Sequence, residues 1–291
     1  LLLLLFLAHF LLKILTLFDE LFLILQFSFV SLIKSYVKKV SILKGFSFKL
    51  FFYHVISLIR LFFGGIMKTI KLSCAHALFK YLIAQKTIID GKKLPLFPGA
   101  FAIYGHGNVA CLGQAMEEFQ SDLPGYRGHH EQSMALTGIG YARAMRRKQI
   151  FIATSSVGPG ATNMVTAAAV AMSNRLPILL LPGDTFASRF PDPVLQQVEN
   201  FNSPIETAND TFKSVSKYFD RITRPEQILA SLPQAIQVML DPSDCGPATI
   251  AMSQDVQGES FDYPEVFFEE KIHQLRRVYP DPNQIKEAAD K

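Results

Sequence analysis

The feature that most constrains the fold is a series of short, continuous apolar runs separated by helix-like segments. Four such runs predict strands, at residues 100–104, 150–154, 177–181 and 247–252. Continuously apolar strands are typical of parallel sheets that are covered on both faces. Helical spacing of apolar residues predicts helices at residues 73–85, 108–119, 131–145, 161–172 and 225–240. The alternation predicts an α/β fold, a doubly wound and mostly parallel sheet with helices on both faces.

The net charge of the chain conceals two different parts. Residues 1–66 hold 7 of the 29 Lys and Arg residues but only 2 of the 25 Asp and Glu residues, a formal charge of +5. Residues 67–291 hold the other 22 bases and 23 acids, a formal charge of −1. The overall charge of +4 therefore belongs to the N-terminal part and gives no reason to expect nucleic-acid binding by the remainder.

Three interpretations of the apolar head, residues 1–66, compete. A membrane anchor needs about 20 apolar residues, and residues 1–18 approach that length but contain His9 and Lys13. A secretory signal should have a basic start and a small-residue cleavage site, and the head has neither. The first Met of the chain is Met67, just before the globular pattern. We therefore favour upstream sequence translated in frame and expect no membrane partner.

The remaining residues divide into a globular domain, 67–260, and a charged segment, 261–291, which we predict to be a linker. Pro233 lies inside the last predicted helix and should kink or split it. The three cysteines, Cys74, Cys111 and Cys245, are widely spaced and form no CxxC pair. We expect free thiols in a reducing cytoplasm.

The most informative block runs from residue 128 to 184. Glu131 opens a helix, where a carboxylate interacts favourably with the helix dipole. Its position at the start of a helix is by itself a sufficient reason for an acidic residue. However, the following turns contain Gly138 and Gly140, which permit close approach of a backbone or a flat ligand. An acid beside such a surface is a candidate for chemistry.

Two glycine-containing loops follow predicted strands, at the sheet edge where open α/β sheets bind ligands. One contains Ser156, Gly158 and Gly160, and the other contains residues 105–108, with the sequence G-H-G-N. The second loop resembles G-x-G-x-x-A, but the acid that dinucleotide binding requires is absent from a second strand. The run at residues 129–131, H-H-E, is too compact for a zinc site. We predict no metal ligands in this chain.

Several motifs in order resemble the pyrimidine-binding domain of thiamine-diphosphate enzymes of the acetolactate-synthase type. They are H-E-Q at 130–132, G-Y-A-R at 140–143, S-x-G-P-G-x-x-N at 156–163 and P-I-L-L-L-P-G at 177–183. The resemblance covers about residues 70–260. Further stretches, at 101–108, 191–197, 220–227 and 253–259, are similar to the branch that hydrolyses trihydroxycyclohexane-1,2-dione to 5-deoxy-glucuronate in inositol catabolism.

The resemblance implies thiamine diphosphate and Mg²⁺ as cofactors and a cyclic polyol diketone as substrate. It makes Glu131 the catalytic residue, hydrogen-bonded to N1′ of the aminopyrimidine ring. The other cofactor-binding residues that it implies are His106, Gly107, Asn108, Ser156, Gly158, Gly160 and Asn163. For His106 and Asn108, loop shaping is the alternative role. Complete enzymes of this type are homo-oligomers, dimers or tetramers.

The diphosphate and Mg²⁺ ligands of such enzymes lie in a G-D-G…N-N motif in a separate domain. Here Thr185 follows Gly183 and Asp184, and no Asn-Asn pair occurs. We therefore expect a fragment that contains half of the cofactor site and is inactive alone, with residues 261–291 leading towards a middle domain. Two alternatives stay open: a fragment of an acetolactate-synthase-like carboligase or decarboxylase, and a non-catalytic pyrimidine-binding module.

Overall fold

The computed structural model describes residues 68–190, 196, 198, 202–277 and 279–291. The chain divides into two units, Leu1–Ile66 and Met67–Lys291. The predictions about the head fall outside the described residues. Within the described part, no helix combines the length and apolar character that a membrane crossing needs.

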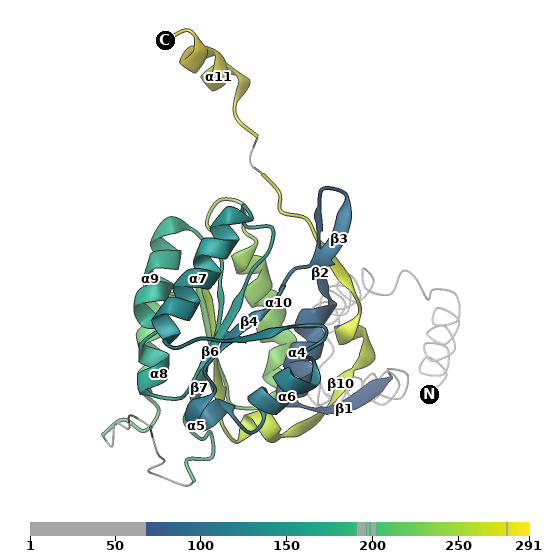
Figure 1. The fold of residues 1–291 in the computed structure, drawn as a ribbon, viewed down its shortest axis with the longest axis vertical. Helices are drawn as coiled ribbons and strands as arrows, with labels where there is room; N and C mark the ends of the chain where they lie inside the picture. Colours follow the sequence, from purple (N-terminus) through teal and green to yellow (C-terminus); the bar gives the residue numbers. More distant parts are fainter. Residues whose placement is uncertain (1–67, 191–195, 197, 199–201, 278) are drawn as a thin grey trace, which may run out of the picture. The chain divides into compact units, whose positions relative to one another are not determined.

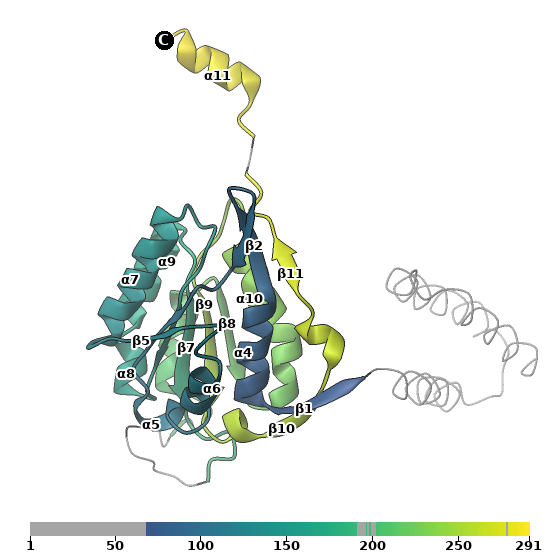
Figure 2. The same ribbon diagram turned by 45° about the vertical axis from the view of Figure 1, so that its right-hand side comes forward.

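The core of the second unit is a six-stranded sheet with the order β5-β4-β6-β7-β9-β8, in which every neighbouring pair is parallel. Figures 1 and 2 show helices on both sides of it. The strands are β4 (Ala100–Ala102), β5 (Gly125–Arg127), β6 (Ile152–Ser155), β7 (Leu179–Asp184), β8 (Tyr218–Ile222) and β9 (Ala248–Ser253). The predicted doubly wound α/β fold is confirmed.

Alternate residues of the central strands enter two separate cores. Ile152 and Leu181 pack on the side of α4 (Cys74–Ala84), α6 (Leu112–Glu118) and α10 (Ile228–Met239). Ala153 and Leu180 pack on the side of α7 (Glu131–Ala144), α8 (Pro159–Thr162) and α9 (Val165–Asn174). Both faces of β6 and β7 are thus buried, which explains why these strands are apolar throughout.

Most predicted helices are present, with three differences. The helix predicted at 108–119 is interrupted, since a short turn, α5 (Gly105–Asn108), precedes α6. The helix predicted at 161–172 is two pieces, α8 and α9. The predicted split at Pro233 is wrong, because α10 continues through this residue after a short 3₁₀ turn, η2 (Pro225–Gln227). Ser73 caps α4, and its hydroxyl accepts a hydrogen bond from the His76 backbone N–H.

Residues 260–273 belong to the folded body, so a linker beginning at residue 261 is wrong in its boundary. β10 (Ser260–Pro264) pairs antiparallel with β1 (Thr69–Ser73). After a 3₁₀ turn, η4 (Glu265–Phe268), β11 (Lys271–His273) joins the hairpin of β2 (Gln85–Ile89) and β3 (Lys92–Pro95). Tyr263 is fully buried and donates a hydrogen bond to the Pro225 carbonyl. Among the residues that the structure describes beyond these strands, α11 (Pro282–Ala289) is the one regular element.

Candidate functional site

The candidate site lies where β4 and β6 end and α7 begins. A parallel sheet directs the carboxyl ends of its strands to one edge, and the loops at that edge form ligand sites in open α/β folds. The loop after β4 contains His106, and the loop after β6 contains Ser156 and leads into α8. Glu131 is the first residue of α7. Three separate chain segments therefore converge there.

The Glu131 carboxylate is held by one amide. Asn163, which follows α8, donates a hydrogen bond from Nδ2 to Oε2 of Glu131 at 3.0 Å. Among the described residues, Oε1 of Glu131 has no hydrogen-bond donor. The side chain is half-buried. The arrangement fixes the direction of the carboxylate and leaves one oxygen available to a ligand.

Gly160 leaves a gap beside this carboxylate. A Cβ added at Gly160 would lie 2.2 Å from the Ser156 Oγ and 3.1 Å from Oε1 of Glu131. Ser156 is itself only 5 % exposed. Any side chain at Gly160 would therefore displace the serine or the carboxylate. Glycine at this position thus allows Ser156 and Glu131 to lie close to the loop backbone.

The loop after β4 contacts the same serine. A Cβ on Gly105 would lie 2.6 Å from the Ser156 Cβ, and the Val157 N–H donates to the His106 carbonyl at 2.9 Å. Gly105 and Gly107 have φ of +44° and +100°, values that favour glycine. Between them the His106 side chain is exposed. The structure thus brings His106 to the loop that also borders Glu131.

Asn108 has the loop-shaping role rather than a ligand-binding one. It is fully buried, and its Nδ2 donates to the Thr154 Oγ1 and to the Ser155 carbonyl, each at 2.7 Å. Its Oδ1 accepts a hydrogen bond from Gln257 Nε2 at 2.8 Å. Since both ends of the amide are bonded within the protein, the prediction that Asn108 contacts a cofactor is not supported. Gly107 serves the same loop through its backbone conformation.

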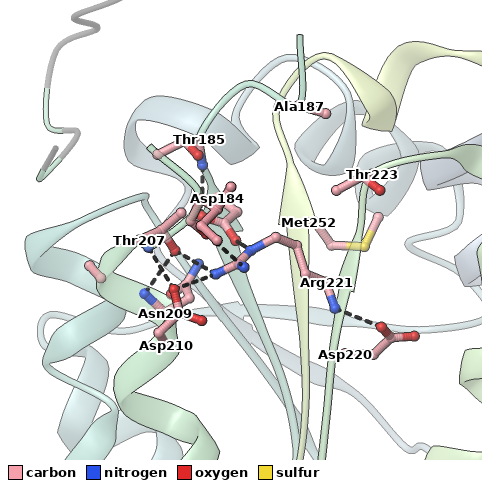
Figure 3. A network of polar contacts seen from close by, with 12 residues as sticks. Asp184, Thr185, Ala187, Thr207, Asn209, Asp210, Asp220, Arg221, Thr223 and Met252 are labelled. Atoms are coloured by element: carbon pink, nitrogen blue, oxygen red, sulfur yellow. Dashed lines mark hydrogen bonds and ion pairs between the residues drawn. The ribbon is translucent and has the colours of Figure 1, made fainter. Parts of the chain in front are cut away.

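A second polar cluster, the Arg221 network, lies at the end of β7 (Figure 3). Arg221 donates from Nε to Asp184 at 2.7 Å and from Nη2 to Asp210 and to the Thr207 hydroxyl, each at 2.9 Å. Asn209 donates from Nδ2 to the Gly183 carbonyl at 2.9 Å. These bonds fasten residues 207–210, which lie between β7 and β8 in the chain, to the sheet edge. Neighbouring acids raise the Arg221 pKa, although burial alone would lower it.

The family model described as "Thiamine pyrophosphate enzyme, N-terminal TPP binding domain" matches residues 99–203, a stretch that includes Glu131, Ser156, Gly160 and Asn163. Residues 99–203 are thus similar to this domain family.

The chain is also similar to curated proteins called 3D-(3,5/4)-trihydroxycyclohexane-1,2-dione hydrolase. Identity is 51 % with the protein of Clostridium tetani, 50 % with that of Bacillus velezensis and 51 % with that of Halalkalibacterium halodurans. Each comparison extends over 224 residues, which are 77 % of this chain and 35 % of the relative. The chain therefore spans about a third of the length of the curated relatives it matches.

Sequence reasoning did not single out two glutamines at the site. The Gln196 Oε1 lies 3.1 Å from His106 Nδ1. The Gln254 side chain packs against Gly107, and its Nε2 is buried without a partner among the described residues. Both lie in stretches that resemble the hydrolase branch, 191–197 and 253–259, but only the folded chain shows that they lie beside His106 and Gly107. His129 and His130 are exposed, and no cluster that could hold a metal occurs among the described residues.

Proposed function

We propose that this chain supplies the pyrimidine-binding part of a thiamine-diphosphate-dependent hydrolase. The substrate is 3D-(3,5/4)-trihydroxycyclohexane-1,2-dione, and cleavage of a ring C–C bond gives 5-deoxy-glucuronate in myo-inositol breakdown. The observation that supports this most is the Glu131 carboxylate at the start of α7, oriented by Asn163 inside the matched domain. The names of the relatives supply the substrate.

The residues of the site fit an aminopyrimidine ring. The free Oε1 of Glu131 can share a proton with a ring nitrogen, N1′, while Oε2 stays bonded to Asn163. The missing side chain of Gly160 leaves room for a flat ring beside that oxygen. When bound, thiamine diphosphate supplies a carbon nucleophile and an electron sink for C–C bond cleavage.

The protein's own contribution is to hold that proton in place. Glu131 and Asn163 keep the proton acceptor in one position, which preorganises the site before a ligand arrives. Ser156, Gly158 and Gly160 form the wall on the β6 side. We further propose that the diphosphate and Mg²⁺ are held outside this chain's length, that the complete enzyme is a homo-oligomer, and that it acts in the cytoplasm.

The test uses the pyrimidine half of the cofactor alone, 4-amino-5-hydroxymethyl-2-methylpyrimidine, titrated into the ¹⁵N-labelled chain. We expect amide shifts at Gly160 and Asn163. Glu131→Gln should weaken binding by about 10- to 100-fold, the factor of one hydrogen bond to a charged group. The free energy of unfolding should change by less than about 0.5 kcal/mol, because the side chain is only half-buried.

The matched control is Glu117→Gln, an exposed glutamate of α6. It should bind the pyrimidine as the wild type does. Equal affinity of the Glu131→Gln chain and the wild type would contradict the proposed role. In the complete enzyme, Glu131→Gln should abolish turnover while the fold remains intact.

A further inference from the structure

His106 lies in a loop whose backbone has an uncommon conformation. Two glycines with positive φ flank it, and its own φ and ψ are −64° and 136°, so the chain turns sharply on both sides. The bond from the Val157 N–H to its carbonyl fixes the residue against the β6 loop. Backbone conformations of low intrinsic stability persist where the surroundings determine them, and they concentrate at functional sites. The imidazole is therefore held at the edge, yet exposed.

Gln196 holds the ring of His106 from a segment distant in sequence. Its Oε1 lies 3.1 Å from His106 Nδ1. Gln196 has a φ of +67°, an uncommon value for a residue with a side chain. Its carbonyl oxygen would lie 1.9 Å from a Cβ on Gly158, whose own φ is also +67°. The backbone of Gln196 can thus reach its position only because residue 158 is glycine.

We propose that Gln196 is a positioning residue that fixes the tautomer of His106. An amide oxygen can only accept a hydrogen bond, so the neutral imidazole must carry its proton on Nδ1, the nitrogen that faces Gln196. Nε2 then carries a lone pair on the exposed side of the ring. A lone pair accepts a hydrogen bond from a hydroxyl group and repels a carbonyl oxygen.

The ligand class that Nε2 would recognise is therefore a hydroxyl-bearing ring. The β4 and β6 loops meet at Ser156, which also borders Gly160 and Glu131, so the same edge presents a proton acceptor to the pyrimidine and another to a polyol. This second assignment rests on the proposed function, since the substrate named there has three ring hydroxyls. The tautomer itself does not depend on that function.

The test measures the ring ¹⁵N shifts of His106 in the full chain with ¹⁵N-labelled histidine, at a pH where the ring is neutral. The wild type should show the Nδ1–H tautomer. Gln196→Leu should lower the ratio of Nδ1–H to Nε2–H about fivefold, the factor of one neutral hydrogen bond. Gln196→Glu keeps an acceptor at this position and should restore the ratio. The control, Gln114→Leu, changes an exposed glutamine of α6 and should have no effect.

An Nε2–H tautomer in the wild type, or a ratio that Gln196→Leu leaves unchanged, would overturn the proposal. Titration with myo-inositol, a cyclic polyol without a carbonyl, should shift Nε2 of His106 in the wild type and less in Gln196→Leu. If Nε2 does not respond to the polyol, the ligand class is wrong. Failure of the proposed function appears separately, as loss of pyrimidine binding at Glu131 with the His106 tautomer intact.

Discussion

Two polar clusters lie at the same edge of one sheet, and they differ in how fully their hydrogen bonds are satisfied. In the Arg221 network, the Asp184 side chain is 1 % exposed and Arg221 is 21 % exposed, and the guanidinium bonds three side chains. At the candidate site, the half-buried Glu131 has one side-chain partner, Asn163, and His106 is exposed.

The difference separates structural from ligand-binding chemistry. A buried charge is tolerated only when protein groups replace its water, and in the Arg221 network the charged groups of Arg221 and Asp184 bond one another. The acceptor there without a described partner is the neutral Asn209 Oδ1. A half-buried carboxylate can keep one oxygen free because water serves it until a ligand arrives. Position at the carboxyl edge is therefore insufficient to identify a site, and a charged acceptor without a protein donor is the better guide.

The largest effect is expected from Arg221→Met. The replacement leaves the buried Asp184 carboxylate with the Thr185 N–H as its remaining described donor, so the free energy of unfolding should fall by about 3–5 kcal/mol. Urea denaturation at neutral pH measures it. The control, Arg224→Met, removes an exposed guanidinium that pairs with the partly exposed Glu226. It should have little effect. Equal losses in the two variants would remove the contrast between the clusters.

An intermediate effect is expected from Gly158→Ala. The added Cβ would meet the Gln196 carbonyl at 1.9 Å and force a positive φ on alanine, which should cost about 1–3 kcal/mol of unfolding free energy. Gly140→Ala is the control: it lies inside α7 with no atom within 4 Å of the new Cβ and should stabilise by about 0.5–1 kcal/mol. Urea denaturation compares the two. A stabilising Gly158→Ala would show that the loop is not constrained as described.

The smallest effect is a pH dependence within the Arg221 network. Burial alone would raise the Asp210 pKa, but hydrogen bonds from Lys213, the Thr207 N–H and Arg221 outweigh it, and the pKa is lowered. A lowered pKa stabilises the fold above the unfolded-state value of about 3.9 and ceases to do so as pH falls through the folded-state value. The stability difference between wild type and Asp210→Asn should therefore shrink below about pH 4. A difference that stays constant down to pH 2 would contradict this.

The central sheet was predictable because its strands are buried on both faces. Residues 177–181 and 247–252 are apolar without interruption, and β7 and β9 overlap them. The peripheral strands were missed, although Phe261 and Tyr263 alternate with polar residues as a half-buried strand requires. The partner of β10 lies about 190 residues earlier in the chain. A local sequence pattern cannot predict a pairing between strands so far apart.

Half of the candidate site was similarly predictable. Glu131, Ser156, Gly160 and Asn163 lie in motifs with fixed spacing, and the structure brings them together. Asn108 was misjudged because a sequence shows a polar residue in a glycine loop but not that Thr154 and Gln257 use both ends of its amide. Gln196 was not singled out because it lies in the long connection between β7 and β8, and only the folded chain shows that it reaches His106.

The pairing of β1 with β10 has a consequence for synthesis. β1 ends at Ser73, and its partner begins at Ser260, so nearly the whole domain must leave the ribosome before β1 is paired. At about 5–20 residues per second, β1 waits for roughly 10–40 s as an unprotected strand. Closing so long a loop also makes this pairing late and slow in refolding. Until then the edge of β1, the first described strand, is open to misassociation, and residues 260–264 protect it once they pair.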